Sequence, residues 1–452
     1  MATRMTSAPV QAVDAARAVN GADRHPKGLY VLFFTEMWER FSFYTVGGMW
    51  VLYVTSQQGF GWPRDQATSV WSWYQMFVYA SPLFGGIFAD RVLGYRKSVM
   101  IGGFFFMAGH ALLAVHSIPV MYAALACLVI GNGFFKPNVS AMVGNLYPDG
   151  SHLKDRAYNI FYMGINVGAL AAPIVAELMV RNFGFHPAFF MGAIGMVFSV
   201  VILWRFKRYV EQADRKPSVN APVSTAATAV DAPPPGVSRQ NAIDAIPDSR
   251  RIGALIVIFL IVIVFWMVFH QNQTTWTYFA NDNVNWNFTG IISNAINPGW
   301  VILLTFPLIW FWGWLDRRGM EPSTPTKMAI GMCLTGAAYF VMYFAGKAGG
   351  DVGRVSPWWL VGAYGVITLG ELMLSPMGLS LVSKVAPTRL KGVMMGGWFL
   401  ATAIGNKLTG VGVLWDDMPH STFFAMLGGL SLFMAVVLTL LLRPLKKAMP
   451  GV

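Results

Sequence analysis

The sequence predicts an all-α integral membrane protein whose twelve transmembrane helices form two bundles of six. Three observations carry this prediction. Of the 452 residues, 55% are hydrophobic and only 12% are charged, whereas an average soluble domain is about 25% charged. Apolar stretches long enough to cross a bilayer recur along the whole chain, and one long polar segment divides them into two equal groups.

Each apolar stretch has about the 20 residues that a helix needs to cross a hydrocarbon core of ~30 Å. Lipid offers no hydrogen-bond partner to an open backbone, so each stretch is expected to be helical. The predicted spans are 29–54, 67–89, 98–116, 119–146, 157–180, 188–207, 252–280, 289–314, 327–346, 358–383, 392–414 and 420–442.

The polar segment 209–251 is rich in Ala, Pro and Ser and shows no apolar periodicity, which is typical of a flexible linker. It is too polar to span a membrane, so we expect no extra helix pair between the bundles. Two similar bundles with a binding site between them are a recurrent plan among secondary transporters. The predicted organisation is a tail 1–28, a bundle 29–208, the linker 209–251, a bundle 252–443 and a tail 444–452.

The net charge of +12 reflects 33 Lys and Arg residues against 21 Asp and Glu residues, and the basic residues are distributed unevenly. Most lie in the N-terminal tail and in the alternate loops that share its side of the membrane. On the opposite side we place only Arg64, Arg181, Lys347 and Arg354. The positive-inside rule then predicts that both termini and the linker are cytoplasmic. The excess charge is therefore a topology signal, and we expect no nucleic-acid partner.

Residues 1–28 contain no apolar core, so the first span is expected to act as an uncleaved anchor. Both cysteines, Cys127 and Cys333, fall inside predicted spans, which suggests neither a disulfide framework nor a metal site. We expect no cofactor and no catalytic residue, because no nucleophile with its base is visible in the sequence.

Several ionisable residues lie deep inside predicted spans, where insertion costs roughly 2.5 to 3.5 kcal/mol each. Such residues are expected to face the interior of the bundle. One interpretation is that they only form ion pairs that hold helices together, but apolar packing would do this at lower cost. The residues are Glu36, Glu39, Arg40, Lys136, His270, Glu371 and Lys407.

The stretch "TEMWERFSFY", residues 35–44, places three charges on one helix. Glu36 lies on the same face as Glu39 and Arg40, at spacings of i+3 and i+4. One guanidinium is thus shared by two carboxylates, and a like charge makes the second acid easier to protonate. This pattern favours a proton carrier.

The loop "GGIFADRVLGYRKS", residues 85–98, joins the second and third spans. A basic cytoplasmic turn would be needed there in any case. The order of its Gly, Asp, Arg and Lys residues resembles the loop signature of the major facilitator superfamily. This resemblance implies the major facilitator fold.

The run "TEMWERFSFY" is similar to the E-x-x-E-R-F-x-Y-Y signature of the proton-coupled oligopeptide transporters, the peptide branch of that superfamily. Further segments resemble the family in the family's order, so the likeness covers nearly the whole chain. They are "GNGFFKPNVSAMVGNLY", "FYMGINVGALAAP", "EPSTPTKMAIG", "SPWWLVGAYGVITLGELMLSPMGLSLVSKVAP" and "MMGGWFLATAIGN".

The resemblance implies that Arg40 and Lys136 hold the carboxylate of a peptide and that Glu371 meets its amino terminus. Independently, a zwitterion needs one cationic and one anionic wall, and the guanidinium of Arg40 suits a planar carboxylate. Without substrate, Lys136 and Glu371 are expected to pair across the halves as an inner gate. Each of these residues could instead belong to a buried ion pair alone.

Further binding positions follow from the same resemblance. Asn166 and Asn297 match positions that hydrogen-bond the peptide backbone, although an Asn beside Gly or Pro can also satisfy a break in a helix. Four residues match positions that line the cavity, although aromatic residues in spans often face lipid or the core. These four are Tyr44, Tyr74, Ser375 and Trp398.

Three features depart from the family. Phe43 replaces the first tyrosine of the signature pair, Gly47 stands where the family often has Arg, and His270 stands where it has an acid. The outer-gate ion pair of the family cannot form here, and many bacterial members carry two extra helices that this chain lacks. We expect His270 to share in proton coupling, because histidine titrates near neutral pH. The alternative is a neutral imidazole bonded to a backbone group.

The sequence therefore predicts a monomeric proton-coupled symporter of the bacterial inner membrane that imports di- and tripeptides. Its proton-coupling residues would be Glu36, Glu39, Arg40, His270 and Glu371. Another small anion or zwitterion, such as nitrate or a modified amino acid, is the alternative cargo. A peptide sensor without transport would need a folded signalling domain, and an integral-membrane enzyme would need a reactive cluster.

Overall fold

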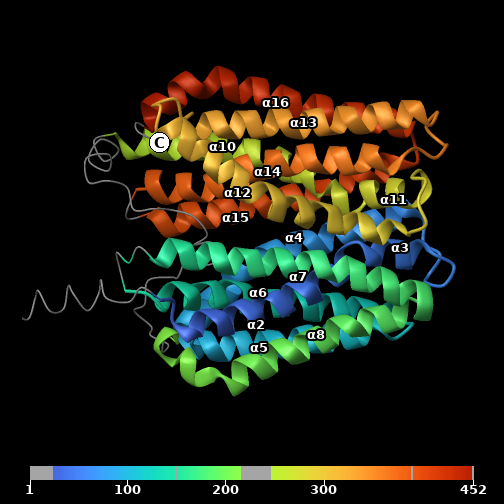
Figure 1. Ribbon diagram of the computed structural model, residues 1–452, viewed down its shortest axis with the longest axis horizontal. Coiled ribbons are helices and arrows are strands. Elements are labelled where there is room, and N and C mark those ends of the chain that lie inside the picture. The colour runs from blue at the N-terminus through green and yellow to red at the C-terminus, as the bar shows by residue number, and fades with distance from the viewer. Residues whose placement is uncertain (1–23, 149–150, 152, 215–245, 388–389, 450–452) are drawn as a thin grey trace, which may run out of the picture.

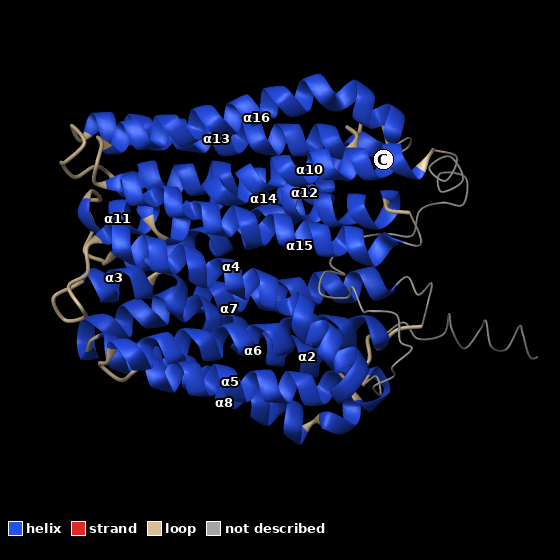
Figure 2. Ribbon diagram, turned by 180° about the vertical axis from the view of Figure 1, so that it is seen from behind, coloured by secondary structure: helices blue, strands red, loops and turns tan. Residues whose placement is uncertain are grey.

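The computed structural model describes residues 24–148, 151, 153–214, 246–387 and 390–449. These residues form helices joined by short loops, as Figure 2 shows. Within the described ranges the chain has no strand, and Val284 and Val355 form an isolated parallel bridge between two loops. The predicted all-α class is therefore confirmed.

Within the described residues, the N-terminal half has seven α-helices. They are α2 (Lys27–Gly47), α3 (Met49–Thr55), α4 (Arg64–Phe88), α5 (Tyr95–Leu113), α6 (Ile118–Asn145), α7 (Leu153–Phe183) and α8 (Phe185–Arg205). A π-helical turn, η1 (Ala89–Leu93), extends α4. Two 3₁₀ turns, η2 (Lys207–Tyr209) and η3 (Glu211–Ala213), follow α8.

The C-terminal half contains α10 (Asp248–Phe269), α11 (Thr275–Asp282), α12 (Ile296–Asp316), α13 (Thr324–Ala348), α14 (Pro357–Val385), α15 (Lys391–Leu408) and α16 (His420–Ala448). In the described part of this half, 3₁₀ segments connect or extend these helices, among them η5 (His270–Gln273), η6 (Gly290–Ala295) and η8 (Thr409–Trp415).

The two halves lie side by side with their helix axes roughly aligned. In Figure 1 the blue and green helices of the first half lie below the yellow and red helices of the second. Helix α4 packs against α15, and α7 packs against α12, where the halves meet. The loops after α3 and α11 lie at the end of the molecule opposite the start of α2 and the end of α16.

All twelve predicted apolar stretches fall on helices. Nine helical segments of the described residues are long and apolar enough to cross a membrane. The stretches 29–54, 98–116 and 392–414 are not among these nine, and α2 carries three charges within one turn. Large apolar side chains are exposed on the outside, among them Phe84 at 72% and Leu440 at 74%, which suits a surface that faces lipid.

The predicted span 252–280 is not one continuous helix. Helix α10 ends at Phe269, and the polar turn η5 separates it from α11. The side chain of Gln271 stabilises this turn, because its Nε2 donates to the Thr409 carbonyl at 2.9 Å and its Oε1 accepts from Thr274 and Thr275 at 3.2 and 3.1 Å. Hydropathy did not predict the break, since four polar residues do not lower the average of a long apolar stretch enough.

The predicted termini and linker lie largely outside the described residues, which exclude 1–23, 215–245 and 450–452. At the C-terminus α16 continues past the predicted boundary at 443 and ends at Ala448. Its last turn carries Lys446 and Lys447, and basic residues at a helix C-terminus are favourable partners for the helix dipole.

Candidate functional site

A cavity of about 250 Å³ lies between the two halves. Helices α2, α4, α6 and α7 line it from the N-terminal half, and α10, η5, α12, α14 and α15 line it from the C-terminal half. Most residues predicted for the site share this lining. They are Glu36, Arg40, Tyr44, Lys136, Asn166, His270, Asn297, Glu371, Ser375 and Trp398.

The charged cluster of α2 is fully buried, with Glu36, Glu39 and Arg40 at most 4% exposed. Arg40 binds Glu39 in a bidentate manner, with Nε at 2.5 Å from Oε2 and Nη2 at 2.6 Å from Oε1. The same Nε lies 3.2 Å from Oε1 of Glu36. The second carboxylate oxygen of Glu36 has no hydrogen-bond partner among the described residues. Glu36 therefore keeps one oxygen for a proton, while Glu39 is fully engaged with Arg40.

Lys136 of α6 is linked to His270 of the C-terminal half through the side chain of Tyr79. Its Nζ lies 5.1 Å from the ring centroid of Tyr79, a favourable cation–π position. The hydroxyl of Tyr79 lies 3.5 Å from Nε2 of His270. The ring of Trp266 stacks on His270 with a centroid distance of 4.8 Å and an interplanar angle of 14°. His270 therefore contacts both halves through rings rather than through a carboxylate.

Glu371 of α14 is held by Asn297 of α12. The Nδ2 of Asn297 donates to Oε2 of Glu371 at 2.9 Å and to Oγ1 of Thr368 at 2.9 Å. The predicted pair of Lys136 with Glu371 is not formed, because no ion pair joins them within the described chain although both line the cavity. The cavity thus has two cations, Arg40 and Lys136, on its N-terminal wall and the Glu371 carboxylate on its C-terminal wall.

The sequence profile of the Major Facilitator Superfamily matches residues 32–410. A peptide transporter of Yersinia enterocolitica is 32% identical to this chain, over 94% of this chain and 95% of its own length. A di-/tripeptide transporter of Lactococcus lactis subsp. cremoris is 31% identical, over 94% and 97%. The crystal structure of a POT peptide transporter in complex with alafosfalin aligns over 98% of this chain and 100% of its own, with 29% identity and a TM-score of 0.82.

The chain belongs to the peptide-transporter (POT) family of the major facilitator superfamily. It is an integral membrane transporter and not an enzyme. The resemblance inferred from "TEMWERFSFY" and the other segments is thus confirmed across the chain. The remaining residues of the site can therefore be compared with the positions expected for this family.

One binding residue predicted from POT resemblance, Tyr74, lies outside the cavity lining. It is buried and packs against Trp71, with ring centroids 5.0 Å apart. The tyrosine of α4 that lines the cavity is Tyr79. Five residues correspond to about 500° of helix rotation, so the two side chains point about 140° apart. Only the orientation of α4 within the bundle decides which one faces the substrate path.

Several residues that line the cavity were missed, among them Tyr162, Trp266, Asn272 and Gln273. The signal for two of them was present, because "HQNQ" at 270–273 is a polar run within an apolar stretch. Gln273 reaches across the halves and accepts a hydrogen bond from Gln75 of α4. A Cβ at Gly47 would lie 3.3 Å from Nε2 of Gln273. The neutral side-chain amides of Gln75 and Gln273 therefore lie beside Gly47, the position where an outer-gate arginine was expected from the POT resemblance.

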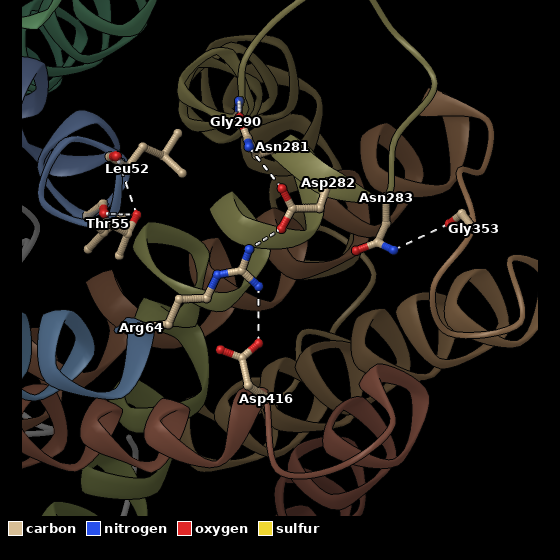
Figure 3. A network of polar contacts seen from close by, with 10 residues as sticks. Leu52, Thr55, Arg64, Asn281, Asp282, Asn283, Gly290, Gly353 and Asp416 are labelled. Atoms are coloured by element: carbon tan, nitrogen blue, oxygen red, sulfur yellow. Dashed lines mark hydrogen bonds and ion pairs between the residues drawn. The ribbon is translucent and has the colours of Figure 1, made fainter. Parts of the chain in front are cut away.

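A charged network joins the halves at the end of the molecule where α4 begins (Figure 3). Nη2 of Arg64 lies 2.5 Å from Oδ2 of Asp282, and Nη1 lies 3.1 Å from Oδ1 of Asp416. Asn281 donates to the other oxygen of Asp282 at 2.9 Å. We call Arg64, Asp282 and Asp416 the Arg64 cluster. In the sequence Arg64 is recognisable only as a loop charge, because its partners lie more than 200 residues away.

Further contacts close the same end. Arg181 of α7 donates to the carbonyl of Asn287 at 2.7 Å, and the carboxylate of Glu177 accepts from the backbone N–H of Thr289 at 2.8 Å and from its hydroxyl. Lys407 of α15 donates to Ser72 of α4 at 3.2 Å. These contacts make the Arg64 end of the interface polar and tightly joined.

Proposed function

We propose that this POT family member is a proton-coupled symporter that imports di- and tripeptides by alternating access. The observation that carries the proposal is one cavity with cations on one wall and a carboxylate on the opposite wall. Relatives named as di-/tripeptide and peptide transporters support this cargo. The alternating conformers exchange access to the cavity between the two sides of the membrane.

A short peptide carries a carboxylate at one end and an ammonium group at the other. We assign its carboxylate to Arg40 and Lys136 and its ammonium group to Glu371. Arg40 offers a planar fork of donors, and Lys136 offers a point charge. Asn166 and Asn297 supply amide groups beside these charges, while Tyr44, Trp398 and Ser375 line the space between them. The side chains of the peptide then contact the other residues that line the cavity.

Protons enter through the acids that line the cavity. The free oxygen of Glu36 accepts one, which weakens the hold of the α2 carboxylates on Arg40 and releases the guanidinium for substrate. Protonation of Glu371 prevents its pairing with Lys136, the contact that we assign to the conformer closed at the other end. A proton drives transport only if its affinity differs between conformers, and these changes of partner supply that difference. No cofactor other than the proton is required.

The Arg64 end faces the outside in this proposal. The distribution of Lys and Arg supports a cytoplasmic location for both termini and the linker. In Figure 1 the loops after α3 and α11 lie at the end opposite the start of α2 and the end of α16. The closed polar contacts at that end then correspond to an inward-facing conformer. We further propose twelve spans without an extra helix pair, a monomer, and insertion in the inner membrane of a bacterial cell.

Uptake by the purified protein in liposomes tests the proposal. An inward pH gradient should drive accumulation of labelled dialanine, unlabelled dipeptides should compete, and nitrate should not. Glu36→Gln should abolish uptake driven by the gradient, and Lys136→Ala should abolish peptide binding. Matched controls are Glu211→Gln and Lys347→Ala, whose side chains are 62% and 53% exposed outside the cavity. The proposal would be contradicted if dialanine uptake did not depend on the pH gradient. It would also be contradicted if nitrate inhibited uptake as strongly as unlabelled dipeptides do.

A further inference from the structure

We propose that the turn η5, with Trp266 before it, forms a subsite for a neutral hydrogen-bonding side chain of the substrate, a hydroxyl or a carboxamide. The inference rests on the proposed function and names the residues that select among peptides. Four residues of this stretch, Trp266, His270, Asn272 and Gln273, line the cavity. They belong to one stretch of eight residues because α10 passes directly into the turn.

Three polar atoms of these lining residues have no hydrogen-bond partner in the described part of the chain. They are Nε1 of Trp266, Nδ1 of His270 and Oδ1 of Asn272. Their residues are only 8%, 6% and 8% exposed, so each atom is almost wholly shielded. Buried polar groups in native proteins are nearly always paired, and an exception calls for a ligand or a functional role.

The neighbouring residue Gln271 shows that the turn does not need these atoms for its own fold. Both ends of the Gln271 side chain are hydrogen-bonded, to Thr409, Thr274 and Thr275. The backbone carbonyl of Asn272 accepts from the hydroxyl of Thr277 at 2.9 Å. The fold of the turn is therefore secured by Gln271 and by the main chain. The side chain of Asn272 is left free for another partner.

The unpaired groups are also held in place before substrate arrives. Trp266 stacks on His270, and Tyr79 contacts Nε2 of the same imidazole from the other half. Gln273 is fixed by its hydrogen bond with Gln75. A partner that binds here orders few side chains, so its hydrogen bonds are gained at low entropic cost.

The chemistry of the wall selects the class of partner. Trp266 donates only, the Asn272 oxygen accepts only, and a neutral imidazole can do either. No residue of the turn is an acid, a lysine or an arginine, and the ionic groups of the cavity are assigned to the two ends of the peptide and to the proton. A hydroxyl or carboxamide both donates and accepts, so it can pair with this wall. An apolar side chain of the same size would leave the buried groups unpaired.

Competition against labelled dialanine in liposomes tests the subsite with peptides matched in shape. The pairs are Ala-Asn with Ala-Leu and Ala-Thr with Ala-Val, each also in the reversed order. We expect the polar member to inhibit at about ten-fold lower concentration in at least one order, the size of one net hydrogen bond. In Asn272→Leu the inhibitory concentration of Ala-Leu should exceed that of Ala-Asn by a factor of only about two or less. Asn182→Leu, an exposed change on α7, should keep the wild-type ratio.

Each outcome distinguishes the subsite from the function. If dialanine is transported but the wild type favours neither Asn over Leu nor Thr over Val in either order, the subsite is wrong while peptide transport stands. If dialanine neither binds nor is transported, the proposed function itself fails, and the subsite fails with it. Should Asn272→Leu not fold, Trp266→Phe removes one donor from the same wall and should lower the ratio. An unchanged ratio in that variant counts against the subsite.

Discussion

Arg64 and Asp282 join the two halves of the transporter through a contact of 2.5 Å between Nη2 and Oδ2. The second arm of the same guanidinium binds Asp416, so one residue of α4 holds two segments of the other half together (Figure 3). Their side chains are 31%, 34% and 53% exposed, so water and salt weaken each pair. Weak contacts of this kind suit a closure that has to open in every cycle.

Loss of the Arg64 cluster should shift the conformers toward opening at that end. We expect Arg64→Gln to lengthen the distance between spin labels at Gln58 and Val352, measured in a background that lacks Cys127 and Cys333, and to lower peptide uptake several-fold. Asp416→Asn should have a smaller effect, because Asp416 is the more exposed partner. Exchange of Arg64 and Asp282 should restore part of the closure. An unaltered distance distribution in Arg64→Gln would show that the remaining contacts at this end keep it closed without the Arg64 cluster.

His270 should influence the pH dependence of uptake. Its Nε2 faces Tyr79 and its Nδ1 is unpaired within the described residues, so the ring could take up a proton without breaking an ion pair. We expect His270→Gln and His270→Ala to alter the pH profile of dialanine uptake. Tyr79→Phe, which keeps the ring but removes the hydroxyl, separates a positional effect from a proton effect. If both histidine variants keep the wild-type profile, proton coupling resides in the acids alone.

Asp351 should make the stability of the C-terminal half dependent on pH. It lies in the loop between α13 and α14 with a φ of 65°, and its carboxylate accepts from the N–H and hydroxyl of Ser421 at 2.6 and 2.9 Å. Burial of the carboxyl opposes ionisation, but the Ser421 hydrogen bonds and Lys347 outweigh it and lower the pKa of Asp351 below 3.8. A lowered pKa in the folded state stabilises the protein above 3.8, and this stabilisation is lost as the pH falls through the folded value.

Thermal unfolding in detergent measures this contribution. Asp351→Asn should lower the Tm by about 2 to 4 °C at pH 7, where a hydrogen-bonded charge is lost, and by less near pH 3. Asparagine tolerates the positive φ, so the backbone should not be strained. Asp417→Asn, at an exposed position, is the control and should leave the Tm unchanged at both values of pH. An equal decrease in Tm at pH 7 and at pH 3 would mean that the charge of the Asp351 carboxylate contributes nothing to stability.

Close packing of α4 on α6 should not tolerate a methyl group at Gly85. A Cβ there would lie 1.9 Å from the carbonyl oxygen of Gly133, which is backbone and cannot rotate away. We expect Gly85→Ala to destabilise the protein by about 1 to 3 kcal/mol. Gly253→Ala is the matched control, since no described atom would lie within 4 Å of its Cβ and alanine favours a helix. Equal unfolding temperatures for the two variants would disprove the packing argument.

Local features of the site could be predicted from the sequence because helix geometry fixes them. Glu36, Glu39 and Arg40 lie within five consecutive residues of one helix, and the structure brings their charged groups together. Lys136 and Glu371 were expected at the cavity because an ionisable group in a span avoids lipid. Both line it, but the contact expected between them is absent from the described residues. Their pairing depends on how far the halves are apart in the conformer at hand.

The sequence by itself determined that the chain crosses a membrane as helices, where those helices lie, and which charges must be kept from lipid. These outcomes depend on hydrophobic length and on the cost of desolvation, which act within single segments. Only the tertiary structure decided that Tyr79 rather than Tyr74 faces the cavity, that η5 interrupts a span, and that Arg64 meets Asp282 and Asp416. Rotation of each helix and the docking of the halves follow from packing between segments distant in sequence, and hydropathy does not record that packing.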